Sequence, residues 1–226
     1  MKNLAIFLLA AFTLSACIKE DNFPQPNATF YGKIIDVETG EPIITSTHGA
    51  GVVRLIEISE KYPDNTAPQD INIGGTGSGL FRNTMIFSGT YKATLHNGPF
   101  QYLGDTIEVR LNGTTEQNFD VLPNMRIRVV KDSETSITYQ VDRPEGITGD
   151  LQKIAVLYNT WETVDLGTSN QVLGNAEFIN AHSGMLGREF SYDFGTKFEA
   201  GNDYYVRIAA SMYGQWNYSP IIHFAL

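Results

Sequence analysis

Cysteine is almost absent from this chain of 226 residues, in which Cys17 is the only one. A single cysteine excludes any disulfide bond within the chain, so the folded part must be stabilised by the packing of apolar side chains. Apolar residues make up 42% of the sequence, which is enough to build such a core. The composition therefore predicts a globular protein and not a disordered one.

Long apolar runs and basic runs are also missing. The longest apolar stretch, residues 4–14, is shorter than the ~20 residues that a membrane-spanning helix needs. Lys and Arg together number 16 against 25 Asp and Glu, which gives a formal net charge of −9. An acidic chain without a basic cluster argues against binding to nucleic acid and against peripheral attachment to anionic lipid.

Motifs of catalytic and metal sites are equally scarce. None of the four histidines has the spacing of a metal-ligand pair, and no calcium loop, cofactor motif or G-x-S-x-G elbow occurs. The glycine-rich stretch 74–79 has no lysine and no helix pattern after it, so we interpret it as a loop. We expect no metal, no cofactor and no enzymatic activity. Because acidic residues are abundant, a carboxylate pair for glycoside hydrolysis stays an alternative.

The first residues indicate export from the cytoplasm. A basic start at Lys2, the apolar run 4–14 and small residues before Cys17 are typical of a secretory signal peptide. The sequence Leu14-Ser15-Ala16-Cys17 resembles a bacterial lipobox, which implies cleavage after residue 16 and acylation of Cys17. Two or more acyl chains attach a protein stably to a membrane. The alternative is an ordinary cleaved signal peptide with a cysteine beside it.

The residues after Cys17 refine this location. The sequence Ile18-Lys19-Glu20-Asp21 resembles the surface-export signal of Bacteroidetes lipoproteins, which implies an outer-membrane protein facing the cell exterior. An anchor that faces the periplasm is the alternative. Residues 17–27 contain two prolines and are predicted to form an extended, lipidated tether.

The remaining chain is predicted to be all-β. Short segments rich in Val, Ile, Tyr, Phe and Thr alternate with turn residues, and no long stretch has helical periodicity. Pro123 interrupts this pattern, so we expect two tandem β-sandwich domains, 28–122 and 124–226, with few contacts across the junction. The predicted strands are 29–36, 52–58, 79–81, 90–95, 106–110, 116–122, 126–130, 135–141, 151–158, 189–194, 204–210 and 219–225. Residues 159–187 are too long for a plain loop, and we expect a short strand or helical turn within them.

The first domain carries a readable motif. Residues 32–43, with the pattern G-x-I-x-D-x-x-T-G-x-P, end a strand at Asp36 and turn at Thr39-Gly40. This pattern resembles the first hairpin of carboxypeptidase-regulatory-like, transthyretin-like sandwiches. The resemblance covers about residues 28–122 and implies a seven-stranded, mostly non-catalytic β-sandwich.

The second domain resembles a fibronectin type III domain, one of the Ig-like sandwiches. Residues 204–210 fit its Y-x-V-x-V-x-A strand, with Tyr204 at the tyrosine-corner position and Ser219-Pro220 at the start of the last strand. Val141 departs from the pattern, because the family usually has a core tryptophan there. Alternation predicts Tyr204, Val206, Ile208 and Ala210 on one face of the strand.

Taken together, the lipobox, the charged tetrad and the two sandwich motifs resemble an uncharacterised family of Bacteroidetes surface lipoproteins. Members commonly belong with outer-membrane glycan-uptake systems. The resemblance implies the outer membrane, polysaccharide and glycan-uptake outer-membrane proteins as partners, while the activity of the family itself is undefined.

One aromatic segment is the candidate binding site. Residues 212–218 are predicted to form a loop at one end of the second sandwich, where recognition residues commonly lie. Aromatic rings could stack on sugar rings while neighbouring amides bind hydroxyl groups, so the candidates are Tyr213, Gln215, Trp216 and Asn217. Alternatively, Trp216 caps the core, and Tyr218 is the stronger core candidate. Trp161 is a further candidate, expected at the opposite end of the sandwich.

These observations predict a non-catalytic surface lipoprotein that assists glycan binding or uptake. The first alternative is a structural scaffold or spacer that packs against an outer-membrane transporter or a partner lipoprotein. The second alternative is a glycoside hydrolase. Exposed aromatic residues at the candidate segment favour sugar binding, whereas converging carboxylates in a cleft favour an enzyme.

Overall fold

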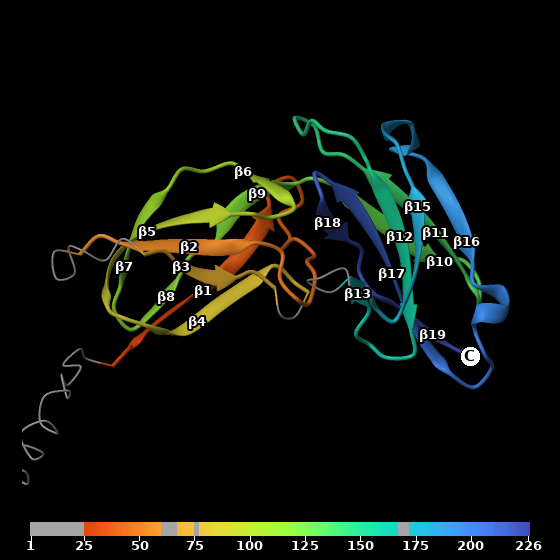
Figure 1. Ribbon diagram of the computed structural model, residues 1–226, viewed down its shortest axis with the longest axis horizontal. Helices are drawn as coiled ribbons and strands as arrows, with labels where there is room; N and C mark the ends of the chain where they lie inside the picture. Colours follow the sequence, from red (N-terminus) through yellow and green to blue (C-terminus); the bar gives the residue numbers. More distant parts are fainter. Residues whose placement is uncertain (1–24, 60–66, 75–76, 167–171) are drawn as a thin grey trace, which may run out of the picture.

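The computed structural model describes residues 25–59, 67–74, 77–166 and 172–226. The predicted signal peptide, Cys17 and the tether up to residue 24 lie outside these residues. The fold is all-β, as the sequence predicts, and consists of two β-sandwiches that lie side by side (Figure 1). No helix in the described part of the chain is long and apolar enough to cross a membrane.

The first sandwich contains the strands before residue 124. One sheet has the order β4-β1-β9-β6, with β8 pairing separately with β1, and the other has the order β3-β2-β5-β7. The bounds of these strands are β1 Ala28–Asp36, β2 Val52–Glu57, β3 Gln69–Asn72, β4 Leu80–Ile86, β5 Gly89–His96, β6 Phe100–Tyr102, β7 Ile107–Leu111, β8 Thr114–Glu116 and β9 Phe119–Pro123.

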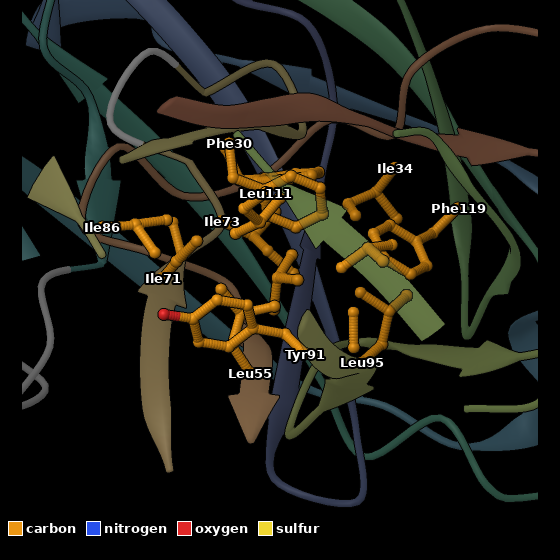
Figure 2. Packing of buried hydrophobic residues seen from close by; sticks show 14 of the residues in the cluster. Phe30, Ile34, Leu55, Ile71, Ile73, Ile86, Tyr91, Leu95, Leu111 and Phe119 are labelled. Atoms are coloured by element: carbon orange, nitrogen blue, oxygen red, sulfur yellow. The ribbon is translucent and has the colours of Figure 1, made fainter. Parts of the chain in front are cut away.

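Alternation of side chains builds the core of this sandwich. In β1, the residues Ala28, Phe30 and Ile34 are fully buried, whereas Thr29, Tyr31 and Lys33 are partly or fully exposed. They meet residues of the other sheet such as Leu55 and Tyr91 (Figure 2). Burial of large apolar side chains, each contributing about 1.5–3 kcal/mol, supplies the stability that disulfide bonds cannot.

The second sandwich contains the strands after residue 124. Its sheets have the orders β10-β11-β16 and β15-β12-β17-β18, with β19 pairing separately with β17, and a short β13-β14 pair lies beside them. The bounds are β10 Arg126–Lys131, β11 Ser136–Asp142, β12 Lys153–Asn159, β13 Asp165–Leu166, β14 Val172–Leu173, β15 Asn175–Asn180, β16 Glu189–Asp193, β17 Asp203–Met212, β18 Gln215–Tyr218 and β19 Ile222–Ala225.

The core of this sandwich is rich in aromatic rings. Phe198 lies between Phe194 and Tyr204, with ring centroids 4.4 Å and 4.1 Å away. The Tyr204 hydroxyl accepts a hydrogen bond from the backbone N–H of Glu199 at 3.0 Å, which is the contact expected of a tyrosine corner. The inward positions of β17 are those that alternation predicts, since Tyr204, Val206, Ile208 and Ala210 all belong to this core.

Several strand predictions need correction. The predicted strand 116–122 is two strands, β8 and β9, which pair with β1 in the same parallel register on either side of Gln117-Asn118. The predicted strand 219–225 begins only at Ile222, and the strands β3, β6 and β18 were not predicted. These strands have only three or four residues, which is too short to establish an alternating pattern in the sequence.

Residues 159–187 contain more structure than the sequence suggested. The expectation of a short strand or a helical turn is confirmed in both forms, by β13–β15 and by a 3₁₀ turn at Ser183–Met185. The strand β15 pairs with β12 in the antiparallel sense and forms one edge of the larger sheet.

Several side-chain contacts cross the junction at Pro123. Arg126 donates to both carboxylate oxygens of Asp36 at 2.6 Å and also to Glu38. Ile44 packs against apolar residues of the second sandwich. Each sheet nevertheless draws its strands from one side of Pro123. The division into two independent domains therefore stays a prediction.

Candidate functional site

The candidate segment 212–218 is a β-hairpin and not a loop, which corrects the sequence interpretation. Strands β17 and β18 pair from Ala209↔Tyr218 to Met212↔Gln215, and only Tyr213 and Gly214 form the turn. Both turn residues have positive φ angles, 53° and 73°, as a two-residue type I′ turn requires. The segment therefore presents alternate side chains to opposite faces of a sheet.

This alternation separates the candidate residues. Tyr213 is 62% exposed and its hydroxyl donates to the carbonyl of Thr148 at 2.5 Å, while Gln215 is exposed beside it. Asn217 is buried, accepts from the N–H of Met125 and donates to the carbonyl of Pro99. Its amide is thus used within the protein and is not available to hydroxyl groups of a sugar.

Trp216 and Tyr218 point to the outer face of the sheet. Tyr218 is 5% exposed, as expected of a core residue, and it belongs to a small apolar cluster on this face. Trp216 is half-buried at the edge of the same cluster. The sequence left two alternatives for Trp216, a surface for stacking and a cap over apolar residues. Its exposed part fits the first, and its contact with the cluster fits the second.

Trp161 lies at the other end of this sheet. It follows β12, whose last residue, Asn159, pairs with Tyr205 of β17. At the end near Trp216, Lys153 of β12 pairs with Ser211 of β17. Six residues of strand separate these ends, which corresponds to about 20 Å. Trp161 is 74% exposed, but the register places it too far away to share one site with Trp216.

Phe178 is the partner of Trp216 that sequence reasoning missed. It lies on β15, is 53% exposed, and its ring centroid is 6.2 Å from that of Trp216. The strands β12 and β17 run between them, so the two backbones are three strand spacings apart, about 14 Å. The two rings therefore lean toward each other over the middle strands.

Small residues on the middle strands make this possible. Phe178 pairs across the sheet with Ala155, which pairs with Ala209, and Ala209 pairs with Tyr218. Both alanines are completely buried, although they point away from the main core. We call the surface formed by Trp216 and Phe178 above these alanines the aromatic platform.

A small cavity of about 90 Å³ adjoins the platform at the junction of the two sandwiches. Trp216, Gln215 and Tyr218 line it from the second sandwich, and Ser46, Ala50 and Pro99 line it from the first. The side of the second sandwich that carries β18 and β13 faces the first sandwich (Figure 1). The site thus combines two aromatic rings, whose planes are tilted by 59° to each other, with a hollow lined by both polar and apolar groups.

A buried polar cluster fixes the two walls of this hollow. Arg207 is 2% exposed and lies 3.6 Å from Asp165, and it donates to the carbonyls of Thr45 and Ser219. Asp165 accepts from both the N–H and the hydroxyl of Thr47. We call these residues, Thr45, Thr47, Asp165, Arg207 and Ser219, the polar joint, because they connect the two sandwiches.

Burial shifts the pKa values of two side chains, one in the polar joint and one next to it. Desolvation lowers the pKa of Arg207, and the charge of Asp165 opposes that shift. Desolvation also raises the pKa of Tyr218, whose ring lies 4.3 Å from the Arg207 guanidinium. Burial therefore favours the neutral form of both side chains, while the charge of Asp165 favours the charged form of Arg207.

Groups with catalytic potential are occupied by structural contacts. Ser183 donates to Asp150, and His182 accepts from the backbone N–H of Gly184, so the two side chains form no dyad. Asp36, which lines a cavity of about 240 Å³, and Glu38 both bind Arg126 through their carboxylates. Within the residues described here, no group of three His, Cys, Asp or Glu is placed to hold a metal ion.

Comparison with known proteins supports the fold. Residues 28–122 match the model of a family described as protein of unknown function (DUF3823), N-terminal domain. A DUF3823 protein from Parabacteroides merdae has a TM-score of 0.68 at 19% identity, and one from Bacteroides uniformis has 0.66 at 23%. A second Bacteroides uniformis protein, named as a candidate carbohydrate binding protein, has 0.61 at 25%. Each comparison covers 89% of this chain and 100% of the other. None of the functionally curated proteins matches the sequence.

Proposed function

Residues 28–122 of this chain belong to the DUF3823 family, and from that premise we propose that the protein is a non-catalytic glycan-binding protein of the cell surface. The predicted membership of an uncharacterised family from Bacteroidetes is confirmed, as is the all-β fold. The observation that carries the proposal is the aromatic platform of Trp216 and Phe178.

The platform suits the chemistry of sugar recognition. An aromatic ring offers a flat apolar face on which the C–H face of a sugar ring can stack, while nearby polar groups can bind hydroxyls. Gln215 lines the cavity next to Trp216, although alternation directs its side chain to the opposite face of the sheet. Similarity to the candidate carbohydrate binding protein over almost the whole of both chains further supports a glycan as the ligand.

Replacing Trp216 by Ala is expected to weaken glycan binding about 5- to 150-fold. This range corresponds to a loss of 1–3 kcal/mol when an aromatic contact is removed from a binding site. Screening residues 22–226 against an array of neutral and acidic polysaccharides identifies the ligand, and titration of the variant with that ligand measures its affinity.

Trp161→Ala is the matched control, because Trp161 is also exposed but lies at the other end of the sheet. It should leave the affinity unchanged, whereas Phe178→Ala should weaken it. If Trp216→Ala lowers the melting temperature strongly and the parent binds no glycan, Trp216 is a structural cap and the proposal is wrong.

The proposed location rests on the leader and Cys17. Acylation of Cys17 would attach the protein to the outer membrane, with the polar tether holding the sandwiches away from the lipid. Cys17→Ala is expected to release the protein from the membrane fraction or to leave its leader uncut, which fractionation and gel mobility would reveal. A variant that partitions and migrates like the parent would refute the lipoprotein proposal.

A scaffold role is the second candidate, and one observation favours it. Val37 and Leu103 are exposed apolar residues beside a cavity of about 290 Å³ in the first sandwich. Exposed apolar patches often mark protein contacts. This surface suits an outer-membrane protein of a glycan-uptake system, and it lies apart from the aromatic platform, so both roles are compatible.

A further inference from the structure

Residues that pair with one another from strand to strand form a row across the sheet, and the row that contains Trp216 also contains a lysine. Asn180 pairs with Lys153, Lys153 pairs with Ser211, and Ser211 pairs with Trp216. Alternation along β12 buries Ile154 in the main core and Ala155 in the outer cluster, so Lys153 lies on the same face as the platform. The row therefore places a cation beside the aromatic surface.

The geometry allows the ammonium group to reach the space next to the Trp216 ring. Lys153 and Trp216 are two strand spacings apart, about 10 Å between their backbones. The residue between them, Ser211, is small and buried, so nothing on β17 rises to separate them. The flexible four-carbon stem of lysine can extend over this position.

Lys153 is available for a ligand. It is exposed, and within the described residues its ammonium group forms no ion pair, hydrogen bond or cation–π contact. Lys197, by comparison, binds Glu177 and Tyr192, and Lys131 lies over the ring of Phe224.

The charge around the platform contrasts with that of the whole chain. The protein has a formal net charge of −9, yet neither the row of Trp216 nor the neighbouring row of Phe178 contains a carboxylate. An anionic ligand would be repelled by most of the surface and attracted at this position.

We propose that the aromatic platform selects anionic polysaccharides, whose sugar rings stack on Trp216 while a carboxylate or sulfate group pairs with the Lys153 ammonium. This inference rests on the proposed glycan-binding function and specifies its ligand class. Lysine acts as a point charge and makes no bidentate contact, so the shared feature of the ligand is a single negative group on a sugar ring.

The test uses polymer pairs that differ in charge but share a sugar skeleton. Polygalacturonate and fully methyl-esterified polygalacturonate compare carboxylate with neutral ester, and dextran sulfate and dextran compare sulfate with hydroxyl. The parent protein is expected to bind at least one charged polymer more tightly than its neutral counterpart. Added salt should reduce this preference, because an exposed ion pair is screened.

Lys153→Gln should weaken binding to the charged polymer by up to about fivefold, as expected when a solvent-exposed ion pair is lost, and should leave binding to neutral polymers unchanged. Lys92→Gln is the matched control, because Lys92 is an exposed strand residue of the first sandwich and the change in net charge is the same. It should have no effect.

The outcomes separate this inference from the function on which it rests. Equal binding of charged and neutral polymers, no binding to either charged polymer, or equal losses in the Lys153 and Lys92 variants would overturn the anionic ligand class. Trp216→Ala tests the platform itself: if it leaves glycan binding intact, the proposed function is wrong. The preferred member of the polymer pairs then distinguishes uronate from sulfate.

Discussion

Replacing Asp165 by Ala is expected to lower the free energy of unfolding by about 3–5 kcal/mol, because it leaves the charge of Arg207 buried without its counterion. Arg207 is 2% exposed and Asp165 is fully buried, so water cannot replace the lost carboxylate. For a protein of this size the melting temperature should fall by about 10 °C, which thermal and urea unfolding can measure.

The same substitution should also loosen the junction between the sandwiches. Asp165 accepts hydrogen bonds from the N–H of Thr47 at 2.5 Å and from its hydroxyl at 2.9 Å. Losing them frees the segment that lines the cavity next to Trp216. Hydrogen exchange of residues near Thr47 should therefore accelerate more than exchange in β2, which lies in the centre of the first sandwich.

An exposed ion pair provides the control. Arg54 and Asp70 form two hydrogen bonds of 2.8 Å, but their side chains are 28% and 35% exposed. Asp70→Ala should cost less than about 1 kcal/mol, because solvent screens the pair and replaces its contacts. Equal effects of Asp165→Ala and Asp70→Ala would contradict the role of the polar joint.

A double substitution distinguishes an unpaired charge from lost packing. In Asp165→Ala with Arg207→Met, no buried charge remains and the methionine retains most of the apolar volume. Such replacement of a buried ion pair is often neutral or stabilising relative to breaking it. The double variant should therefore be more stable than Asp165→Ala alone. If it is less stable, the energy resides in the hydrogen bonds of Arg207 to Thr45 and Ser219.

Much of the fold is predictable because strand alternation is a local signal. Strand β17 shows this well, since every second residue from Tyr204 to Ala210 lies in the core as its sequence indicates. The turn at Thr39-Gly40 and the Tyr204 corner were likewise recognisable from a few adjacent residues. Such features depend on chemistry within about ten residues of sequence.

The candidate site is less predictable because its residues meet only through long-range pairing. Phe178 and Trp216 are separated by three strand spacings, and their contact depends on Ala155 and Ala209 having small side chains. Asn217 was proposed to bind sugar, but its amide connects Met125 to Pro99, which no local pattern reveals. Asp165 belongs to the polar joint, and no motif in the sequence indicates this role.

The split of the predicted strand 116–122 has a similar cause. Strand β1 pairs in parallel with β8 through Thr29–Tyr31 and then with β9 through Ile34–Asp36. Between these contacts Gln117 donates its N–H to the carbonyl of Tyr31, and the side chain of Asn118 accepts from the N–H of Lys33. The chain thus crosses close to β1 at Gly32, an arrangement that depends on a residue 85 positions away.

Gly32→Ala should consequently be among the most damaging single substitutions. A Cβ atom at residue 32 would lie 1.8 Å from the carbonyl oxygen of Gln117 and 2.7 Å from its carbonyl carbon. Both atoms belong to the backbone, so no side-chain rotation can relieve the overlap, and β1 must separate from its neighbour. We expect a loss of about 3 kcal/mol or more in the free energy of unfolding, measured by urea denaturation.

Gly40→Ala is the appropriate comparison, because Gly40 has a φ of 73° and no atom within 4 Å of an added Cβ. Only the left-handed backbone strain opposes that substitution, at a cost of about 1–2 kcal/mol. The difference between the two variants isolates the steric contact at β1 from general effects of replacing glycine. A Gly32→Ala protein as stable as the Gly40→Ala protein would mean that β8 and β9 do not pass β1 at the distance described.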